Sequence, residues 1–270
     1  MTVTVSALHV YPVKGLGGID LDEAYCTDRG LKHDRRWMVV DEVGEFITQR
    51  DLPKMATVWT DLTHDSLVLS APDFGEVDVP FEPDGRQRMR VRVWKSTCDA
   101  LPASSEADAW LTEYLGHECK LVYMPEGTKR MSNQEFAGTN KLVSFADGYA
   151  YLVTGEASLE DLNNRLKEKG HAALPMNRFR PNIVVKGAAA YAEDSFGEIA
   201  IGEAILKGAK PCGRCQVTTT DQATGEVVGP EPLATLTTYR ESSRFGLMFG
   251  MNLVTVRPGR IAVGDIVKPT

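Results

Sequence analysis

The chain has 270 residues, of which 43% are hydrophobic and 25% are charged, and its formal net charge is −7 at pH 7. These values are typical of a globular protein and exclude a disordered, collagen-like or fibrous chain. No apolar run approaches the roughly 20 residues of a membrane helix, and the N-terminus lacks the apolar block of a signal peptide. The acidic balance gives no general affinity for nucleic acid or for an anionic membrane surface. We therefore expect a cytoplasmic protein that binds neither a nucleic acid polymer nor a membrane.

The first ninety-five residues predict short strands separated by turns. Runs of β-branched and aromatic residues bounded by Gly, Pro, Asn or Asp favour strands. These runs cover residues 3–10, 36–41, 45–50, 58–62, 66–71 and 89–95. The turns between them include the Pro-Asp-Gly sequence at 83–85. Their close spacing indicates a compact antiparallel sheet or barrel.

Two helices are expected in the middle of the chain. Apolar residues between positions 107 and 115 recur at helical spacing, and Ser105 with Asp108 resembles a capping box. A second helix has apolar residues at 159, 162 and 166, with Ser158 and Asp161 as capping residues. Gly170 follows it, where a C-terminal cap glycine belongs.

The other segments complete a mainly β pattern. A strand over 120–124 and a long loop over 125–139 precede the second helix, and a third helix begins near Pro232. Further strands are predicted over 182–186, 198–201, 204–207, 216–220, 253–256 and 266–268. This order is not a regular βαβ alternation, which argues against a doubly wound parallel sheet. We therefore expect a mainly β fold with a few helices.

The chain has few cysteines and an odd number of them, which is not typical of a secreted disulfide scaffold. The five cysteines are Cys26, Cys98, Cys119, Cys212 and Cys215. Only Cys212 and Cys215 lie close together in the sequence, in a C-x-x-C pair that also contains Arg214.

A C-x-x-C pair is compatible with four kinds of site. A structural zinc site needs four ligands, and the sequence has no second pair and no nearby His pair. A thioredoxin-like dithiol normally lies at the start of a helix, whereas a strand-like sequence follows Cys215. A single thiolate can instead bind a soft metal, with Lys210 and Arg214 favouring the charged form. The fourth alternative is a pair of half-buried thiols at a strand end without a chemical role.

Two N-terminal segments contain candidate anion ligands. Lys14 with Gly15 follows the first predicted strand, at a turn that is either an anion site or a solvated hairpin tip. Arg35 lies between Asp34 and Trp37 in the sequence. This group either holds a phosphate or a planar ring, or forms an ion pair above a buried tryptophan.

A third candidate segment precedes the strand over 182–186. Arg180 and Asn182 alternate to the same side of an extended chain, where they either contact a ligand or only flank the strand. No Ser/His/Asp triad, P-loop or dinucleotide fingerprint accompanies these segments.

Eight segments in order give the chain a resemblance to a known family. They read YPVKG, HDRRWMVVD, GEASLEDLNNRL, RFRPNIVVKG, YAEDSFGEIAIGE, PCGRCQVTTTDQATGEV, EPLATLTTYR and PGRIAVGD. Together they resemble MOSC-domain proteins, in particular the branch of the mitochondrial amidoxime-reducing component and its bacterial relatives. The resemblance implies a small N-terminal β-barrel-like domain over residues 1–122. It also implies a MOSC β-barrel with peripheral helices over residues 123–270.

Members of this family bind a molybdenum cofactor, a single pyranopterin dithiolene with a terminal phosphate, in a cleft between the domains. The resemblance makes Cys215 the metal ligand and the catalytic residue, with Cys212 as a neighbour. It assigns cofactor contacts to Lys14, Gly15, Arg35, Gly148, Tyr149, Arg180, Asn182, Gly213 and Arg214. Close relatives carry Ser in place of Gly15 and Thr-Ser in place of Gly148 and Tyr149. We expect backbone N–H groups to replace those hydroxyl contacts.

The resemblance also implies a reaction, the reduction of amidoximes, hydroxylamines or N-hydroxylated bases to amines with release of water. Each turnover consumes two electrons and two protons, and we expect a separate flavoprotein or iron–sulfur protein to deliver the electrons. The alternative is a module that binds or carries molybdenum cofactor or sulfur without reductase activity. MOSC domains also occur fused to cofactor sulfurases, and we expect no pyridoxal-phosphate enzyme domain of that kind here.

Overall fold

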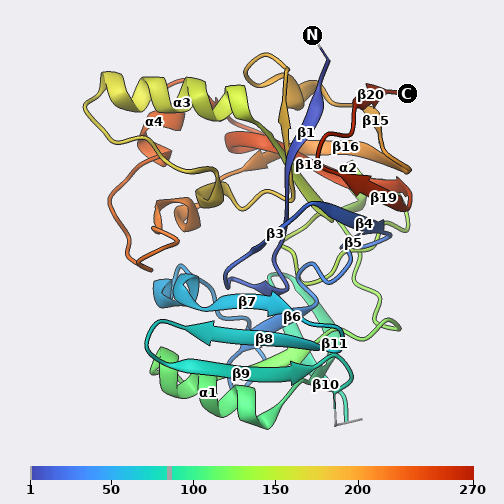
Figure 1. Cartoon of the computed structure of the whole chain (residues 1–270), viewed down its shortest axis with the longest axis vertical. Coiled ribbons are helices and arrows are strands. Elements are labelled where there is room, and N and C mark those ends of the chain that lie inside the picture. Colours follow the sequence, from blue (N-terminus) through green and yellow to red (C-terminus); the bar gives the residue numbers. More distant parts are fainter. Residues whose placement is uncertain (1, 84–86) are drawn as a thin grey trace.

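The computed structural model describes residues 2–83 and 87–270, and it has two lobes (Figure 1). The lower lobe in Figure 1 holds one sheet in the order β10-β11-β12-β6-β2 and another in the order β7-β8-β9. Its strands are β2 (Val13–Lys14), β6 (Trp37–Val40), β7 (Trp59–Leu62), β8 (Ser66–Ala71), β9 (Gly75–Pro80), β10 (Met89–Val93), β11 (Ser96–Pro102) and β12 (Lys120–Tyr123). Helix α1 (Ser105–Leu115) packs against β9 and β12.

The upper lobe is built on a large sheet in the order β20-β15-β16-β18-β13-β14-β1-β3, with β17 on β18, and a small sheet β19-β4-β5. The large sheet contains β1 (Thr4–Val10), β3 (Ile19–Leu21), β13 (Tyr151–Gly155), β14 (Ile183–Lys186), β15 (Glu198–Ile201), β16 (Ala204–Gly213), β17 (Glu241–Ser242), β18 (Gly246–Arg257) and β20 (Val267–Pro269). The small sheet contains β4 (Glu23–Thr27), β5 (Gly30–Leu31) and β19 (Gly259–Ala262). The helices are α2 (Gln134–Ala137), α3 (Glu156–Glu168) and α4 (Leu233–Thr237). No helix in residues 2–83 and 87–270 has both the length and the apolar character needed to cross a bilayer.

The chain passes repeatedly between the lobes. Strand β1 pairs antiparallel with β14 in the upper lobe, whereas β2 pairs parallel with β6 in the lower lobe, so the chain crosses at residues 11–12. It crosses again at residues 32–36, between β5 and β6, and over the long segment 124–150 between β12 and β13. Segments far apart in the sequence therefore meet where the lobes join.

The strands of both lobes confirm the predicted mainly β fold. Each lobe has its own apolar core. Trp37 is fully buried in the lower lobe, among residues of α1, β6 and β8. Val153 and Leu253 are fully buried in the upper lobe. Complete burial of such side chains stabilises the fold by about 1.5–3 kcal/mol each. Burial switches at every residue along β8, so one face of this strand packs on the core.

The predicted strand over 45–50 is wrong. Only isolated bridges form there, from Phe46 to Val40 and from Glu45 to Arg92. The Thr48 hydroxyl donates to Asp51 Oδ2 at 2.9 Å and accepts the Arg50 N–H at 3.1 Å. A side chain that bonds to nearby backbone competes with the sheet ladder, and the chain turns away.

The predicted strand over 216–220 is also wrong, because residues Gln216–Thr219 form a 3-10 turn. The hydroxyls of Thr218 and Thr219 donate to the carbonyls of Cys215 and Gln216, at 2.9 and 2.8 Å. Threonine favours strands by packing, but these local hydrogen bonds override that preference. Strand β16 is correspondingly longer than predicted and continues to Gly213.

The helices are in the expected places, but their N-terminal caps differ. Ser104, rather than Ser105, caps α1 by accepting the Ala107 N–H at 3.3 Å, because Ser105 is already helical. Asp108 instead accepts the Leu121 N–H at 2.6 Å and joins the helix to β12.

Helix α3 begins after Gly155 and has no side-chain cap of its own. Ser158 is buried and donates to Glu193 at 2.8 Å, so the predicted cap at Ser158 is wrong. The cap predicted at Asp161 is wrong too, because its carboxylate accepts from Arg165 Nε at 2.7 Å. The C-terminal end of α3 is as predicted, since Gly170 follows the helix with a left-handed φ of 79°.

The segment after β12 is not entirely a loop. The loop predicted over 125–139 contains α2, which begins after Asn133, whose side chain accepts the Glu135 N–H at 3.0 Å. The turn predicted over residues 83–85 includes positions that lie outside the described residues.

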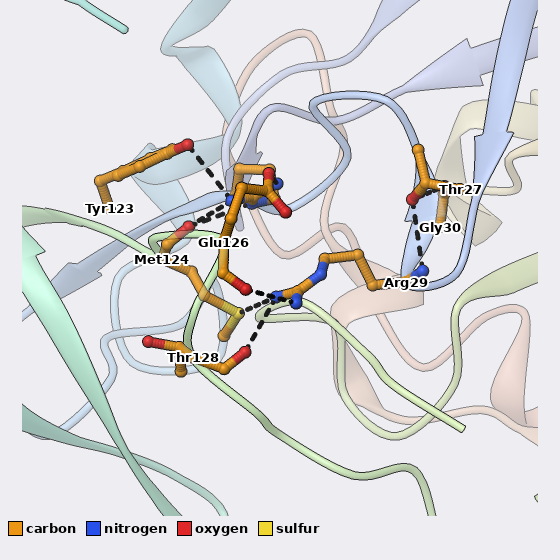
Figure 2. A network of polar contacts seen from close by, with 8 residues as sticks. Thr27, Arg29, Gly30, Tyr123, Met124, Glu126 and Thr128 are labelled. Atoms are coloured by element: carbon orange, nitrogen blue, oxygen red, sulfur yellow. Dashed lines mark hydrogen bonds and ion pairs between the residues drawn. The ribbon is translucent and has the colours of Figure 1, made fainter. Parts of the chain in front are cut away.

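Two buried arginines fasten the segment after β12 to the rest of the molecule (Figure 2). Arg29, in the turn between β4 and β5, donates to the carbonyls of Glu126 and Thr128 at 3.1 and 3.2 Å. Arg36, which precedes β6, donates to Glu126 Oε1 at 2.5 Å and to the carbonyl of Met124. The segment that leaves the lower lobe is thus held from both lobes.

We expect Arg29→Met to lower the free energy of unfolding by about 1–3 kcal/mol, because two carbonyls lose their donor. Arg260→Met is the matched control, since that arginine is 63% exposed and pairs with Glu23 on the surface. It should cost less than about 1 kcal/mol. Urea denaturation of both variants measures the difference, and equal small losses contradict the proposed role of Arg29.

Stability should also depend on the protonation of His33. Burial, with its ring stacked on Phe81 at 4.8 Å, lowers the pKa of His33 from 6.5 to about 4. Between these values the unfolded chain binds more protons than the folded one, so stability falls as the pH drops from about 6.5 to about 4. In His33→Asn, whose side chain tolerates the left-handed backbone at this position, the fall should be shallower. Denaturation across this pH range tests it, with exposed His64→Asn as control; an unchanged slope contradicts it.

Candidate functional site

A cavity lies where the crossing segments meet β13, β16 and the turn after β16. It brings together every residue that the family resemblance assigned to the cofactor or the metal: Lys14, Gly15, Arg35, Gly148, Tyr149, Arg180, Asn182, Gly213, Arg214 and Cys215. Cys212 lines it as well. The individual roles of these residues stay predictions, but they now belong to one site.

The thiol side of the cavity is formed by the end of β16. Gly213 is the last residue of that strand, and a Cβ there would lie 2.3 Å from the Phe245 carbonyl oxygen. Only glycine allows this approach. The chain then turns, and Cys215 precedes the 3-10 turn with its side chain exposed. Cys212 is half-buried, and Arg214 Nη1 lies 2.9 Å from its sulfur. The two thiols therefore have different surroundings.

The cationic side of the cavity includes two arginines with free buried donors. Arg180 has a left-handed backbone, with φ 54° and ψ 48°, and its Nη1 donates to Gln222 at 3.3 Å. Arg214 Nη2 donates to the Phe179 carbonyl at 2.7 Å. Arg180 Nη2 and Arg214 Nε are buried without a partner among the described residues. Burial lowers the pKa of Arg180 to about 10, so its guanidinium is charged at neutral pH.

The Asp34 carboxylate connects the crossing segments 11–12 and 32–36 to the segment that precedes β14. It is 1% exposed and pairs with Arg35 Nη1 at 2.6 Å. It also accepts the Tyr11 N–H at 2.9 Å and the Asn182 side-chain amide at 3.0 Å. Asn182 in turn accepts the Leu152 N–H at 3.2 Å. The sequence paired Asp34 with an arginine, but its contacts with Tyr11 and Asn182 depend on the fold.

Lys14 and Asp147 form an ion pair at the rim of the cavity. Burial lowers the pKa of Lys14, and Asp147 partly opposes this. Asp147 also accepts the Trp94 indole N–H at 3.0 Å, from the hairpin turn between β10 and β11. Partial desolvation raises the pKa of Asp147, but the Lys14 ammonium and the Trp94 N–H outweigh it and hold that pKa well below its usual range. Asp147 is therefore an anion.

The cavity carries a surplus of positive charge. The charged side chains among its described lining residues are Lys14, Arg35, Arg50, Asp147, Arg180 and Arg214. Five of these are cations and one is a carboxylate. Such a lining attracts an anionic ligand, and the low dielectric of a partly enclosed site strengthens the attraction.

A pair of linked amides that no sequence pattern predicted lies at the cavity: Gln49 lines it, and Gln222 bonds to Gln49. Gln49 is 1% exposed and donates to the Gly15 carbonyl at 2.6 Å. Gln222 donates to Gln49 Oε1 at 3.0 Å and accepts from Arg180. Gly15 itself has φ 87°, a conformation that favours glycine. No sequence pattern singled out Gln49, because the segment 45–50 was predicted to be a strand.

Two family models match the chain. Residues 2–118 match the MOSC N-terminal beta barrel domain, and residues 140–268 match the MOSC domain. The chain belongs to the MOSC-domain family.

Curated MOSC-domain relatives extend over nearly the whole chain. The mitochondrial amidoxime-reducing component 1 of Mus musculus is 35% identical over 280 residues, covering 98% of this chain and 81% of that protein. The Homo sapiens component 1 is 34% identical, covering 98% and 82%. The mitochondrial amidoxime reducing component 2 of Bos taurus is 34% identical with the same coverage as the human protein.

The five cysteines should differ sharply in reactivity. Burial raises the pKa of Cys26 to about 12 and of Cys119 to about 11, and it also raises that of Cys98. Cys215 is exposed and Cys212 half-buried. Since the thiolate is the nucleophile, brief alkylation of the folded, cofactor-free protein should label Cys215 first.

Peptide mapping by mass spectrometry after alkylation measures this order. The Cys215→Ser variant should lose the fast phase, and the three buried cysteines should react only after denaturation. Labelling of Cys26, Cys98 or Cys119 at the rate of Cys215 in the folded protein contradicts the assignment.

Proposed function

We propose that the chain is a molybdenum-cofactor-dependent oxidoreductase that reduces N-hydroxylated compounds to amines. The observation that carries this proposal is one cavity in which the exposed thiol of Cys215 faces a surplus of cationic side chains. A soft thiolate is a suitable ligand for molybdenum, and the cations suit an anionic cofactor. The names of the MOSC-domain relatives, which refer to amidoxime reduction, support the choice of substrate class.

The cavity residues fit a phosphorylated pterin. Arg180 Nη2 and Arg214 Nε are buried donors without a partner among the described residues. Leaving each unpaired costs about 1–3 kcal/mol, and ligand oxygens remove that cost. At Gly148 a Cβ would meet nothing within 4 Å, so the wall there leaves room for a ring. These features favour an anionic ligand with several acceptor oxygens.

In this proposal each side of the cavity has its own task. Cys215 supplies the protein's sulfur ligand to the metal, and Lys14, Arg35, Arg180 and Arg214 bind the pterin and its phosphate. When bound, the cofactor supplies the two-electron chemistry that removes oxygen from nitrogen. The protein contributes orientation and electrostatic stabilisation.

Neither of the two titratable groups in the crossing segment 146–149 is suited to donate the reaction's protons at neutral pH. Asp147 is held ionised by Lys14 and Trp94. Burial raises the pKa of Tyr149 to about 12, so its phenol keeps its proton; the buried O–H has no partner among the described residues and is free to donate to a ligand. We infer that solvent delivers the protons through the open rim, where the Asp147 side chain is 64% exposed.

The electron donor in this proposal is a separate flavoprotein or iron–sulfur protein, and the site of action is the cytoplasm. The substrate is a small N-hydroxylated compound that enters at the rim. A test with an artificial donor is therefore preferable, because it does not depend on the identity of the natural partner.

The proposal is tested by expressing wild-type protein, Cys215→Ser and Cys212→Ser in a host that makes the cofactor. Molybdenum is measured by elemental mass spectrometry and pterin by its fluorescent oxidation product. Wild-type protein and Cys212→Ser should carry near-stoichiometric metal and pterin. Cys215→Ser should lose metal by at least about tenfold, since even outer groups around a metal change its affinity by this much.

Benzamidoxime reduction with a chemically reduced viologen dye then measures activity. The wild type should produce benzamidine, and Cys215→Ser should not. A folded wild-type protein without metal and pterin refutes the proposal. Full cofactor content without turnover of any N-hydroxylated compound refutes the reductase part and favours a cofactor carrier.

A further inference from the structure

Tyr11 lies at the first crossing between the lobes and contacts two cations of the cavity. Its ring centroid is 4.4 Å from Arg35 Cζ and 4.2 Å from Arg180 Cζ. The side chain is 4% exposed and is not itself part of the cavity lining. Neither its sequence position nor the family resemblance assigned it a role.

The two guanidinium groups carry the same charge, and their surroundings differ. Arg35 is paired with Asp34, whereas Arg180 has no carboxylate partner among the described residues. Both residues have left-handed backbones, with φ 49° and 54°, which non-glycine residues rarely adopt. Strain of this kind persists only where the surroundings fix it, and it gathers at ligand sites.

An aromatic ring attracts cations over its face, so Tyr11 offsets the repulsion between the two arginines. The ring is itself held firmly. A Cβ on Gly18 would lie 2.5 Å from Tyr11 Cε1, so the ring packs directly on that glycine. The Tyr11 carbonyl accepts the Arg35 N–H at 2.7 Å, and the Tyr11 N–H donates to Asp34. The ring therefore has a fixed position relative to Arg35.

We propose that Tyr11 is a positioning residue that holds the guanidinium groups of Arg35 and Arg180 together as one clamp for an oxyanion. The inference rests on the proposed function, in which that oxyanion belongs to the phosphorylated pterin. Arg180 Nη2, a buried donor without a partner among the described residues, is the group that the clamp offers to the ligand. Tyr11 acts through the two arginines and does not touch the cofactor.

A ring that only fills space and a ring that attracts cations respond differently to fluorine. Fluorination of phenylalanine withdraws charge from the ring face with little change of shape, so it weakens a cation–π contact and spares packing. The experiment compares Tyr11→Phe with proteins that carry mono-, di- and trifluorinated phenylalanine at position 11. Thermal unfolding of each protein shows that the fold is retained.

The readout is the molybdenum and pterin that the holoprotein retains after dialysis against rising salt. Tyr11→Phe should retain cofactor within about twofold of wild type, and retention should fall with each fluorine, by about tenfold over the series. The matched control is Tyr239, whose ring faces Arg165 Cζ at 3.9 Å and does not line the cavity. The same series at position 239 should leave retention unchanged.

A second readout is a double-mutant cycle. Because Tyr11 acts through Arg35 and Arg180, Tyr11→Leu should cost less cofactor retention in the Arg180→Met background than in the wild type. Additive losses, or a flat fluorine series in proteins that fold and load cofactor, overturn the inference.

Binding of inorganic pyrophosphate to the cofactor-free protein, measured by calorimetry, separates this inference from the proposed function. Pyrophosphate affinity should fall with each added fluorine at position 11, as cofactor retention does. A wild type that never loads cofactor refutes the proposed function, while a graded loss of pyrophosphate affinity still supports the clamp. Pyrophosphate affinity that is unchanged along the series overturns the clamp.

Discussion

The buried carboxylate of Asp34 is the contact on which the geometry of the cavity depends. It accepts hydrogen bonds from Arg35, from the Tyr11 backbone and from Asn182, three groups that lie in separate segments between strands. A buried carboxylate is costly unless its oxygens are paired, and here two of the pairing residues, Arg35 and Asn182, line the cavity. Loss of any one of these groups weakens the positions of the others, because they share one acceptor.

The charges of the cavity follow from this arrangement. Asp34 neutralises Arg35 and Asp147 neutralises Lys14, which leaves Arg180, Arg214 and Arg50 without a carboxylate among the described lining residues. Uncompensated cations in a partly enclosed space are unfavourable for the empty protein. An anionic ligand relieves that cost, so the same charges that strain the empty site strengthen binding.

Residue type and order in the sequence predict much of the site, since Lys14, Arg180 and Cys215 were identified before any contact was known. Residue types with turn signals likewise predict β8 closely, and the helical spacing of apolar residues predicts α1. The reversal after Cys215 was missed because threonine favours strands on average, while two particular hydroxyls bond to local carbonyls here. Gln49 and Trp94 were missed because their partners, Gly15 and Asp147, are distant in the sequence and become neighbours only in the fold.

The position of the cavity at the crossings has a consequence for how it assembles. Cys215 follows a strand of the upper lobe, whereas Lys14 belongs to β2 and pairs with the lower-lobe sheet. A thiol on one lobe and a cation on the other can bind one ligand only when the lobes are in register. The Asp34 contacts, Arg29 (Figure 2) and Arg36 maintain that register. A ligand that contacts both lobes adds further contacts across the lobe interface. Ligand binding and the stability of that interface therefore reinforce each other.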